Sequence, residues 1–284
     1  MRPAGEPLAS AAMIRPLLLA AALATAAAAL ADPVRDRVYP APTAPLSLAG
    51  LPAGVGFAEV TTADGLRLKG LEIAGDAAEP VLLLFHGNGS SAADALGWFR
   101  PLLERGYGAV AAEYRGYSAN PGAPSERGLA ADADAFLGRA RALANGRRVV
   151  VVGHSLGGGV AFGLAARQKL DALVTVGTFT RLRAMAPKLA RAFIRDRYDN
   201  LAAVPTLDEP FHLVHGAADD VVSADMGEEL HQAAVKARKP GASWLVQAAG
   251  HVPDIAVVGL AIEAAARPDA PLPAAPAGVR VFAR

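Results

Sequence analysis

The 284-residue sequence contains no cysteine, no long run of like charge and no internal repeat. Without cysteine, disulfide bonds, thiolate metal sites and a lipid-modified cysteine are excluded. The 28 basic and 27 acidic residues leave a formal charge of +1, which indicates neither a nucleic-acid nor an acidic-membrane partner. The composition is 52% hydrophobic, with 29 glycines and 21 prolines. It is typical of a globular chain long enough for one large α/β domain.

The first 31 residues have the pattern of a secretory signal peptide. Arg15 precedes an apolar run, PLLLAAALATAAAALA, which ends in a small-x-small site just before Asp32. Met13 would give a more compact signal than Met1. We therefore predict an exported protein, periplasmic or secreted, whose mature chain begins at Asp32. The alternative is that the segment remains uncleaved and anchors the chain in a membrane.

Strand and helix patterns alternate along most of the remaining chain. Residues 32–55 form an extended Pro/Ala-rich leader, and residues 58–75 alternate in polarity around Asp64-Gly65, which predicts a β-hairpin. Apolar runs then predict strands at 80–87, 106–116, 148–152, 172–179, 210–216 and 243–250. Helical periods occupy 91–105, 125–143, 156–168, 224–238 and 254–267. This alternation predicts a mostly parallel sheet with helices on both faces.

Two segments depart from this alternation. Residues 181–203 form a mixed, basic helical stretch between a strand and the next apolar run. Residues 268–284 are rich in proline and alanine and are predicted to be a mobile tail, although Val279 to Phe282 could pack back onto the domain. We therefore predict that the domain itself covers residues 56–267.

The most strand-like run of the chain, four valines, leads directly into Gly153-His154-Ser155-Leu156-Gly157. This fits G-x-S-x-G, the strand-to-helix turn that exposes a nucleophilic serine. Glycines are needed because the turn is strained and a Cβ would collide with neighbouring backbone. Ser155 would then lie at a helix N-terminus, where free N–H groups and the helix dipole favour a developing negative charge. The alternative is purely structural, a tight turn before a helix packed closely on the sheet.

A serine nucleophile needs a base, and the base needs an acid that orients it. After such a turn the expected chain order is serine, acid and histidine. Asp219 and Asp220 follow the strand 210–216, and His251 follows the next strand, so the order holds. His154 belongs to the turn itself and is expected to point away from the line of attack of the serine. The other histidines lie where structural roles are expected: His86, His212, His215 and His231.

Six segments follow one another along the chain: FHGNG, YRGYSANPGAPSERGLAADADAFL, GHSLGGGVA, RDRYDN, HGAADDVV and AGH. In this order they resemble the α/β-hydrolase superfamily, and within it the BEM46-like and ABHD13-like serine hydrolases. The resemblance covers about residues 58–267 and implies an α/β-hydrolase fold with a short lid at about 179–203. It also implies that the acid is Asp219, with Val222 closing the pattern and Asp220 as the alternative. Ser118 stands where family members often have glycine.

The negative oxygen of an acyl-transfer intermediate needs two N–H donors. Leu156, the residue after the serine, is expected to provide one of them. For the other, the resemblance implies the backbone N–H of Asn88, whose flanking glycines would let it approach a substrate. Here the chain has Ser90-Ser91 where the family often has further glycine or asparagine.

We interpret the sequence as a serine hydrolase that cleaves a carboxylic ester, or a related acyl bond of a small molecule, through an acyl-serine. No metal, organic cofactor or nucleic acid is implied. The alternatives are a peptidase or amidase, a thioesterase or lipid hydrolase, and a non-catalytic binding protein on the same fold. A lid this short indicates an open, modest pocket. Its arginines could meet an acidic substrate, but a solvated basic face is the favoured interpretation.

Overall fold

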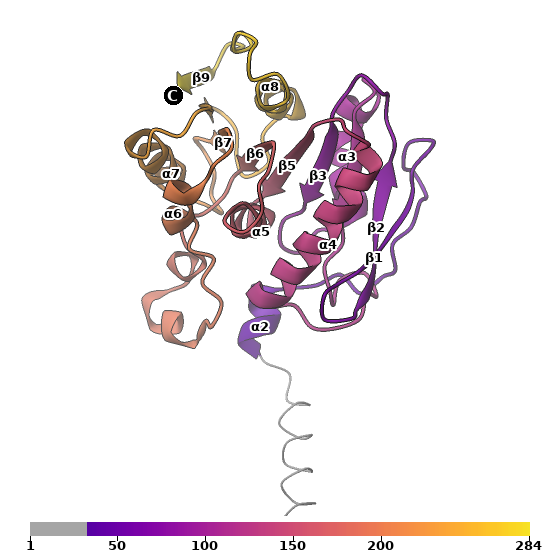
Figure 1. The fold of residues 1–284 in the computed structure, drawn as a ribbon. Coiled ribbons are helices and arrows are strands. Elements are labelled where there is room, and N and C mark those ends of the chain that lie inside the picture. Colours follow the sequence, from indigo (N-terminus) through magenta and orange to yellow (C-terminus); the bar gives the residue numbers. More distant parts are fainter. Residues whose placement is uncertain (1–32) are drawn as a thin grey trace, which may run out of the picture.

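The computed structural model describes residues 33–284, so the predicted signal segment lies outside the described residues. One nine-stranded sheet runs through the domain in the order β1-β2-β4-β3-β5-β6-β7-β8-β9 (Figure 1). Its strands are β1 (Gly56–Thr61), β2 (Arg67–Ile73), β3 (Val81–Phe85), β4 (Gly108–Ala112), β5 (Val149–His154), β6 (Ala172–Val176), β7 (Phe211–Gly216), β8 (Ala242–Val246) and β9 (Val279–Ala283). The strands from β4 to β8 pair in parallel, and antiparallel strands continue the sheet at both edges.

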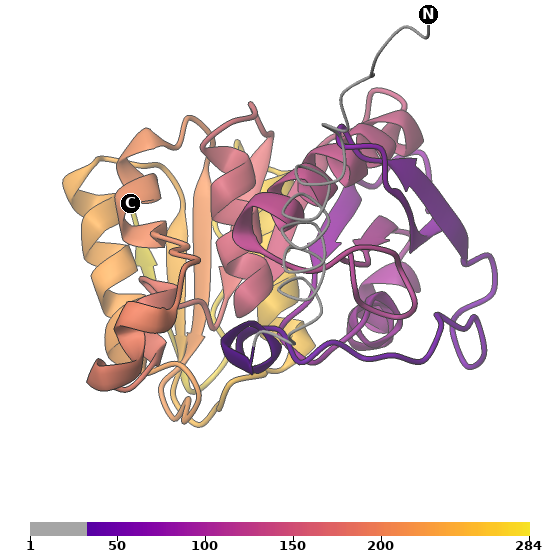
Figure 2. The same cartoon turned by 90° about the horizontal axis from the view of Figure 1, so that it is seen from below.

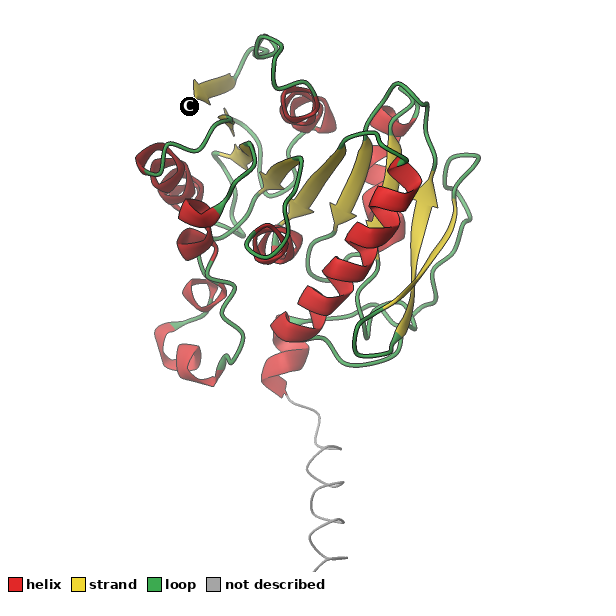
Figure 3. Cartoon of the chain, in the orientation of Figure 1, coloured by secondary structure: helices red, strands yellow, loops and turns green. Residues whose placement is uncertain are grey.

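Helices cover both faces of this sheet (Figure 3). They are α2 (Pro33–Val38), α3 (Ala92–Leu103), α4 (Glu126–Ala144), α5 (Leu156–Ala165), α6 (Asn200–Ala203), α7 (Ala224–Lys236) and α8 (Ile255–Ala266), with three 3-10 helices, η1 (Leu182–Met185), η2 (Lys188–Phe193) and η3 (Val204–Thr206). Side chains of α4, α5 and α7 form the core on one face, and side chains of α3 and α8 form the core on the other. The predicted mostly parallel sheet with helices on both faces is confirmed.

The sequence explains why the central strands lie where they do. All five residues of β3 are buried, because this apolar run is covered by helices on both faces of the sheet. The predicted hairpin forms β1 and β2, with Asp64-Gly65 in the turn, and its residues pair in register from Gly56 with Glu72 to Thr61 with Arg67. The continuous apolar runs therefore became central strands, and the alternating stretch became the edge.

Several predicted strands are too long at their carboxyl ends. The strands predicted at 106–116, 172–179 and 243–250 end at Ala112, Val176 and Val246. Residues beyond these points leave the sheet and build the loops above its carboxyl edge, where functional groups gather in parallel sheets. The predicted helical stretch at 181–203 is likewise broken into η1, η2 and α6, because Pro187 holds the preceding residue in an extended conformation.

The two ends of the described chain are more ordered than the sequence predicts. The leader is not extended throughout, because it begins with α2, and the next residue, Tyr39, is 3% exposed. The domain does not end at residue 267, because β9 forms within the predicted tail and pairs with β8, whose edge would otherwise be open. Among the helices of residues 33–284, none combines the length and apolarity that crossing a membrane requires.

Arg284 ties β9 to the domain. Its guanidinium donates to the hydroxyl of Ser243 and to the carbonyl oxygen of Phe211, and lies 5.2 Å from the centre of the Phe211 ring. Burial lowers the pKa of this guanidinium to about 10. A charged residue held this closely indicates that the last strand is part of the folded core.

Deletion of residues 279–284 is therefore expected to lower the free energy of unfolding by at least about 3 kcal/mol, at about 1 kcal/mol for each of the three hydrogen bonds that the Arg284 guanidinium donates to Lys239, Ser243 and Phe211. Urea denaturation measures the change. Arg280→Ala, an exposed change in the same strand, serves as the control and should cost no more than about 1 kcal/mol, because the guanidinium loses only its contact with the Phe282 ring, 5.1 Å from the ring centre. Equal stability of the truncated chain and the parent would show that β9 contributes nothing to the fold.

Candidate active site

The predicted site residues converge at the carboxyl edge of the parallel strands. Ser155 follows β5, Asp219 follows β7, and His251 follows β8. Asn88 lies in the loop after β3. Ser155, His251 and Asn88 line one cavity, and Asp219 lies behind His251. Residues far apart in the sequence therefore meet because the strands that carry them are parallel.

The backbone of Ser155 is held in a strained conformation. Its φ of 52° and ψ of −115° lie in a region that residues with a side chain rarely adopt. The N–H of Ser155 donates to the carbonyl oxygen of Val176 over 2.9 Å. Added methyl groups at the flanking glycines would collide with backbone, at Gly157 with Phe85 and at Gly153 with Gly157. The turn therefore has the shape that G-x-S-x-G predicts, with Ser155 at the N-terminus of α5.

Asp219 holds one side of the His251 ring. Its Oδ2 lies 2.9 Å from Nδ1 of His251, and its Oδ1 accepts the backbone N–H groups of Val221 and Val222 over 2.9 and 2.8 Å. Burial alone would raise the pKa of this carboxyl, but the hydrogen bonds from His251 and the two N–H groups outweigh it and lower the pKa. The buried side chain is therefore an oriented carboxylate at neutral pH.

Asp220, the alternative acid, is placed differently. It is exposed, whereas the side chain of Asp219 is fully buried. The two consecutive residues leave the turn in different directions, and the structure brings Asp219 to His251.

Two further residues fix the position of His251. Gly177 has a φ of 54°, and a methyl group on it would come within 3.1 Å of the carbonyl oxygen of His251 and within 3.2 Å of Nδ1 of its ring. His154 Nε2 lies 3.0 Å from the same carbonyl oxygen, and the two imidazole rings are 4.7 Å apart. Sequence reasoning missed both contacts, although Gly177 directly follows a parallel strand and could have been suspected for that reason.

The surroundings of His154 add to what the sequence predicts. Its Nε2 lies at the backbone of His251, and the residue lines the same cavity as Ser155 and His251. Burial, and next the neighbouring charge of His251, lower the pKa of His154 to about 4. At neutral pH His154 is therefore uncharged, and its Nε2–H can donate to the backbone of His251 without placing a second positive charge there.

The loop after β3 is fixed by both ends of the Asn88 side chain. Its Nδ2 donates to the carbonyl oxygen of Val38 in α2 over 2.7 Å, and its Oδ1 accepts the hydroxyl of Tyr117 over 3.0 Å. Asn88 lines both cavities beside Ser155, and Leu156 lines one of them. The N–H of Leu156 is the first of α5 and has no carbonyl partner within that helix.

Buried hydrogen bonds of His86 and Glu113 support the same loop. Nε2 of His86 lies 3.0 Å from Oε1 of Glu113, and the other oxygen of Glu113 accepts the N–H of Ala92 at the start of α3. The Tyr114 hydroxyl donates to the carbonyl oxygen of His86 over 2.8 Å. These contacts agree with the structural role expected for His86. Glu113 itself was not singled out from the sequence, because the predicted strand 106–116 included it, whereas β4 ends at Ala112.

Two serines stand where the resembled family often has glycine or asparagine, and local contacts explain both. Ser118 adopts a φ of 46°, the left-handed conformation that favours glycine, and its N–H donates to the carbonyl oxygen of Pro42 over 2.7 Å. Ser91 caps α3 by accepting the N–H of Asp94, while Asp94 accepts the N–H of Ser91 in return. The serine that departs from the family pattern after Asn88 therefore starts the helix that forms one wall of the site.

His215 completes the turn that carries Asp219. Its Nε2 lies 2.9 Å from the carbonyl oxygen of Val222, and burial lowers its pKa, so the ring is neutral and donates to that oxygen. This is the structural role expected from the sequence. Within residues 33–284, no group of three or more histidine, aspartate and glutamate side chains is arranged to hold a metal ion.

Two cavities meet at Ser155. We call the first, of about 500 Å³, the α3 cavity; its lining includes Ala95 and Trp98 of α3 together with His154 and His251. We call the second, of about 630 Å³, the lid cavity. It lies between α2 and the short helices η1 and η2, and its lining is mostly apolar: Val38, Leu156, Phe179, Leu182, Met185, Ala186, Pro187, Ala190, Phe193, Ile194 and Val221. Ser155 therefore borders both cavities, so two different parts of a bound molecule have room beside it.

Comparison with known proteins identifies similar chains. A family model described as the alpha/beta hydrolase fold matches residues 80–202. An uncharacterised protein of Mycobacterium tuberculosis is 33% identical over 202 residues, which span 66% of this chain and 70% of the relative. Among solved structures, an esterase of Pyrococcus furiosus is 22% identical with a TM-score of 0.61, over 81% of this chain and 95% of that one.

A puromycin-hydrolysing peptidase of Mycobacterium tuberculosis is also similar in structure. It is 18% identical with a TM-score of 0.57, over 70% of this chain and 36% of that one. At identities this low, likeness shows the fold alone, and the similar structures carry out both ester and peptide chemistry. The choice between these reactions therefore depends on the residues of this site.

Proposed function

Because the chain belongs to the α/β-hydrolase fold family, we propose that it is a serine hydrolase that cleaves a carboxylic ester through an acyl-serine intermediate. The observation that carries the proposal is the hydrogen bond between His251 and a buried, ionised Asp219, beside the cavity in which Ser155 is held at positive φ. A turn that stores strain at a serine, next to an oriented imidazole, is typical of an activated nucleophile.

In the proposed first step, Oγ of Ser155 attacks the ester carbonyl carbon and its proton passes to Nε2 of His251. Asp219 keeps Nδ1 protonated and stabilises the imidazolium that forms. The carbonyl oxygen becomes negative and accepts the N–H groups of Asn88 and Leu156. The tetrahedral intermediate then breaks its bond to the alcohol oxygen, which takes the proton from His251 and leaves the acyl group on Ser155.

Water completes the cycle by the same route. His251 removes a proton from a water molecule, whose oxygen attacks the acyl carbon, and the bond to Oγ of Ser155 breaks as the proton returns to that oxygen. The products are a carboxylic acid, an alcohol and the free serine. Neutral His154 supports this sequence because it adds no positive charge beside the imidazolium of His251.

The cavities favour an ester with an apolar acyl group. The lid cavity offers mostly aliphatic and aromatic side chains, which favour the transfer of an acyl chain from water. A panel of p-nitrophenyl esters of increasing chain length, run beside aminoacyl-anilides, tests the proposal. We expect hydrolysis of the esters, with kcat/KM rising as the acyl chain lengthens to fill the cavity. Faster hydrolysis of the anilides would instead identify an amidase or peptidase.

Gly177→Ala is expected to lower kcat for ester hydrolysis about 10²-fold, the loss that a displacement of about 1 Å can cause in an active site. The added methyl group would press on the ring and backbone of His251 from a residue with positive φ. The control is Gly138→Ala in α4, where a methyl group has no heavy atom within 4 Å. Circular dichroism checks that both variants fold. If the two variants were equally active, the position of His251 would not limit the reaction.

A further inference from the structure

The formal charge of +1 for the whole chain conceals a basic surface at the lid. Between residues 181 and 199 the chain has two acids, Asp196 and Asp199, against a larger set of bases. The bases are Arg181, Arg183, Lys188, Arg191, Arg195 and Arg197. Both acids are engaged, Asp196 with the Tyr39 hydroxyl and Asp199 with Arg181 at 3.0 Å. The lid therefore has a local excess of positive charge that bulk composition does not reveal.

The same region has the most exposed large apolar side chains of the described residues. Leu189 and Phe193 of η2 are 92% and 69% exposed, and Val252 and Val221 are 59% and 55% exposed. Val221 borders both cavities, Val252 borders the α3 cavity, and Phe193 borders the lid cavity. The four most exposed large apolar side chains therefore lie in η2 and in two loops that border the cavities, while the less exposed ones lie elsewhere: Leu48, Phe57, Val235 and Leu272.

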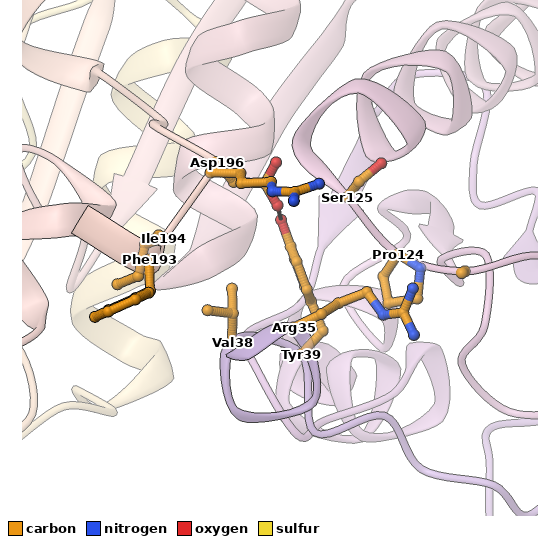
Figure 4. A pocket seen from close by; sticks show the side chains of 10 residues that line it. Arg35, Val38, Tyr39, Pro124, Ser125, Phe193, Ile194 and Asp196 are labelled. Carbon is orange, nitrogen blue, oxygen red and sulfur yellow. Dashed lines mark hydrogen bonds between the residues drawn. The ribbon is translucent and has the colours of Figure 1, made fainter. Parts of the chain in front are cut away.

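Helix α2 is joined to the lid and extends this surface. The Tyr39 hydroxyl donates to Asp196 over 2.5 Å and lies 3.1 Å from the hydroxyl of Tyr198. Figure 4 shows Val38 facing Phe193 and Ile194 across a pocket of about 320 Å³. In Figures 1 and 2, α2 and the lid lie at the same end of the domain. Helix α2 adds two basic residues there, Arg35 and Arg37, and one acid, Asp36, which lies 3.8 Å from Arg35, so its net contribution is one positive charge.

We propose that this surface, which we call the lid face and define as α2, η1, η2, Val221 and Val252, docks onto an anionic phospholipid surface. Exposed leucine, phenylalanine and valine side chains can enter the boundary between headgroups and acyl chains, while arginine and lysine side chains contact the anionic headgroups. A nucleic acid would match the charge but would leave the aliphatic side chains in water. A lipid surface matches both properties.

Docking on a lipid surface would place the opening of the lid cavity against a source of substrate. Its apolar lining connects the lid face with Ser155, so an acyl chain drawn from the docked surface would stay in apolar surroundings on its way to the nucleophile. This delivery of a lipid ester rests on the proposed hydrolase function, whereas docking itself does not require Ser155 to react.

Flotation of the full chain with vesicles tests the docking. The protein carries Ser155→Ala, so that the measurement does not depend on hydrolysis, and the vesicles are phosphatidylcholine with or without phosphatidylglycerol. We expect binding to the vesicles that contain phosphatidylglycerol, weakened by added salt. Leu189→Ser/Phe193→Ser should weaken binding about tenfold or more. Lys188→Gln/Arg195→Gln should weaken it about fivefold for each cation removed.

The control is Val235→Ser/Leu272→Ser, which removes two exposed apolar side chains outside the lid face and should leave binding unchanged. The N-terminal apolar segment is present in every variant. If that segment alone caused binding, the lid variants would bind like the parent, and the proposal would be overturned. The proposal would also be overturned if the parent chain did not bind the vesicles. One such result would be a parent chain that self-associates but does not bind vesicles, with the self-association lost in Leu189→Ser/Phe193→Ser. Ester hydrolysis without vesicle binding would leave the proposed function intact.

Discussion

Ser155→Ala and His251→Ala are each expected to lower kcat for p-nitrophenyl ester hydrolysis about 10⁶-fold, and the double variant is expected to lose no more than either single one. Ser155 cannot attack without a base to take its proton, and His251 has no nucleophile to activate when Ser155 is replaced. The two side chains therefore act as one unit. Steady-state kinetics of the three variants measure the effect.

The matched control is Ser90→Ala, which removes another hydroxyl from the lining of the α3 cavity. Its activity should remain within about tenfold of the parent, because the Ser90 hydroxyl contacts Asp94 and not Ser155, Asp219 or His251. A double variant far slower than both single variants would show that Ser155 and His251 contribute independently, which contradicts the proposed mechanism.

Asp219→Asn is expected to lower turnover about 10⁴-fold, the loss found when an amide replaces the acid of a serine-protease triad. The asparagine oxygen can still accept the N–H groups of Val221 and Val222, so the turn is retained. Its NH₂ group would then face Nδ1 of His251 and force the ring proton onto Nε2. In that tautomer the imidazole cannot accept the proton of Ser155.

The neighbouring carboxylate provides the control for this change. Asp220→Asn should cost about tenfold or less, because Asp220 is exposed and the change is a surface substitution. Circular dichroism verifies that both variants fold, and kinetics on one short ester compares them. A severe loss in Asp220→Asn with an active Asp219→Asn would move the acid to Asp220. Full activity in both would contradict the role of an acid in this site.

Much of the fold follows from the sequence, because its strongest signals are local. The valine strand, the apolar run 80–87 and the polarity alternation around Asp64-Gly65 each specify an element without knowledge of its neighbours. The alternation of such elements then leaves few topologies, and the α/β-hydrolase fold expected from the resemblance is confirmed. The predictions failed where elements depend on distant partners. Helix α2 is held through Val38 and Asn88, and β9 forms because β8 offers an open edge.

The sequence predicts the order of the candidate site residues along the chain, but not their arrangement in space. Chain order indicated Ser155 and His251, and the resemblance implied Asp219 rather than Asp220, but the residue order does not reveal the turn that buries one and exposes the other. The roles of Gly177 and His154 arise from packing against the His251 ring. The side-chain hydrogen bonds of Asn88 connect loops far apart in the sequence. No periodicity or motif encodes such contacts, because they appear only when several strand ends meet at one edge of the sheet.

The nucleophilic role of Ser155 is the central claim, and covalent labelling tests it most directly. Folded protein would be treated with a fluorophosphonate, digested, and analysed by mass spectrometry to locate the modified residue. We predict a single adduct on Ser155, absent from Ser155→Ala and strongly reduced in His251→Ala, because Oγ needs the imidazole to accept its proton. An adduct on another residue, or none on the folded protein, would contradict the account.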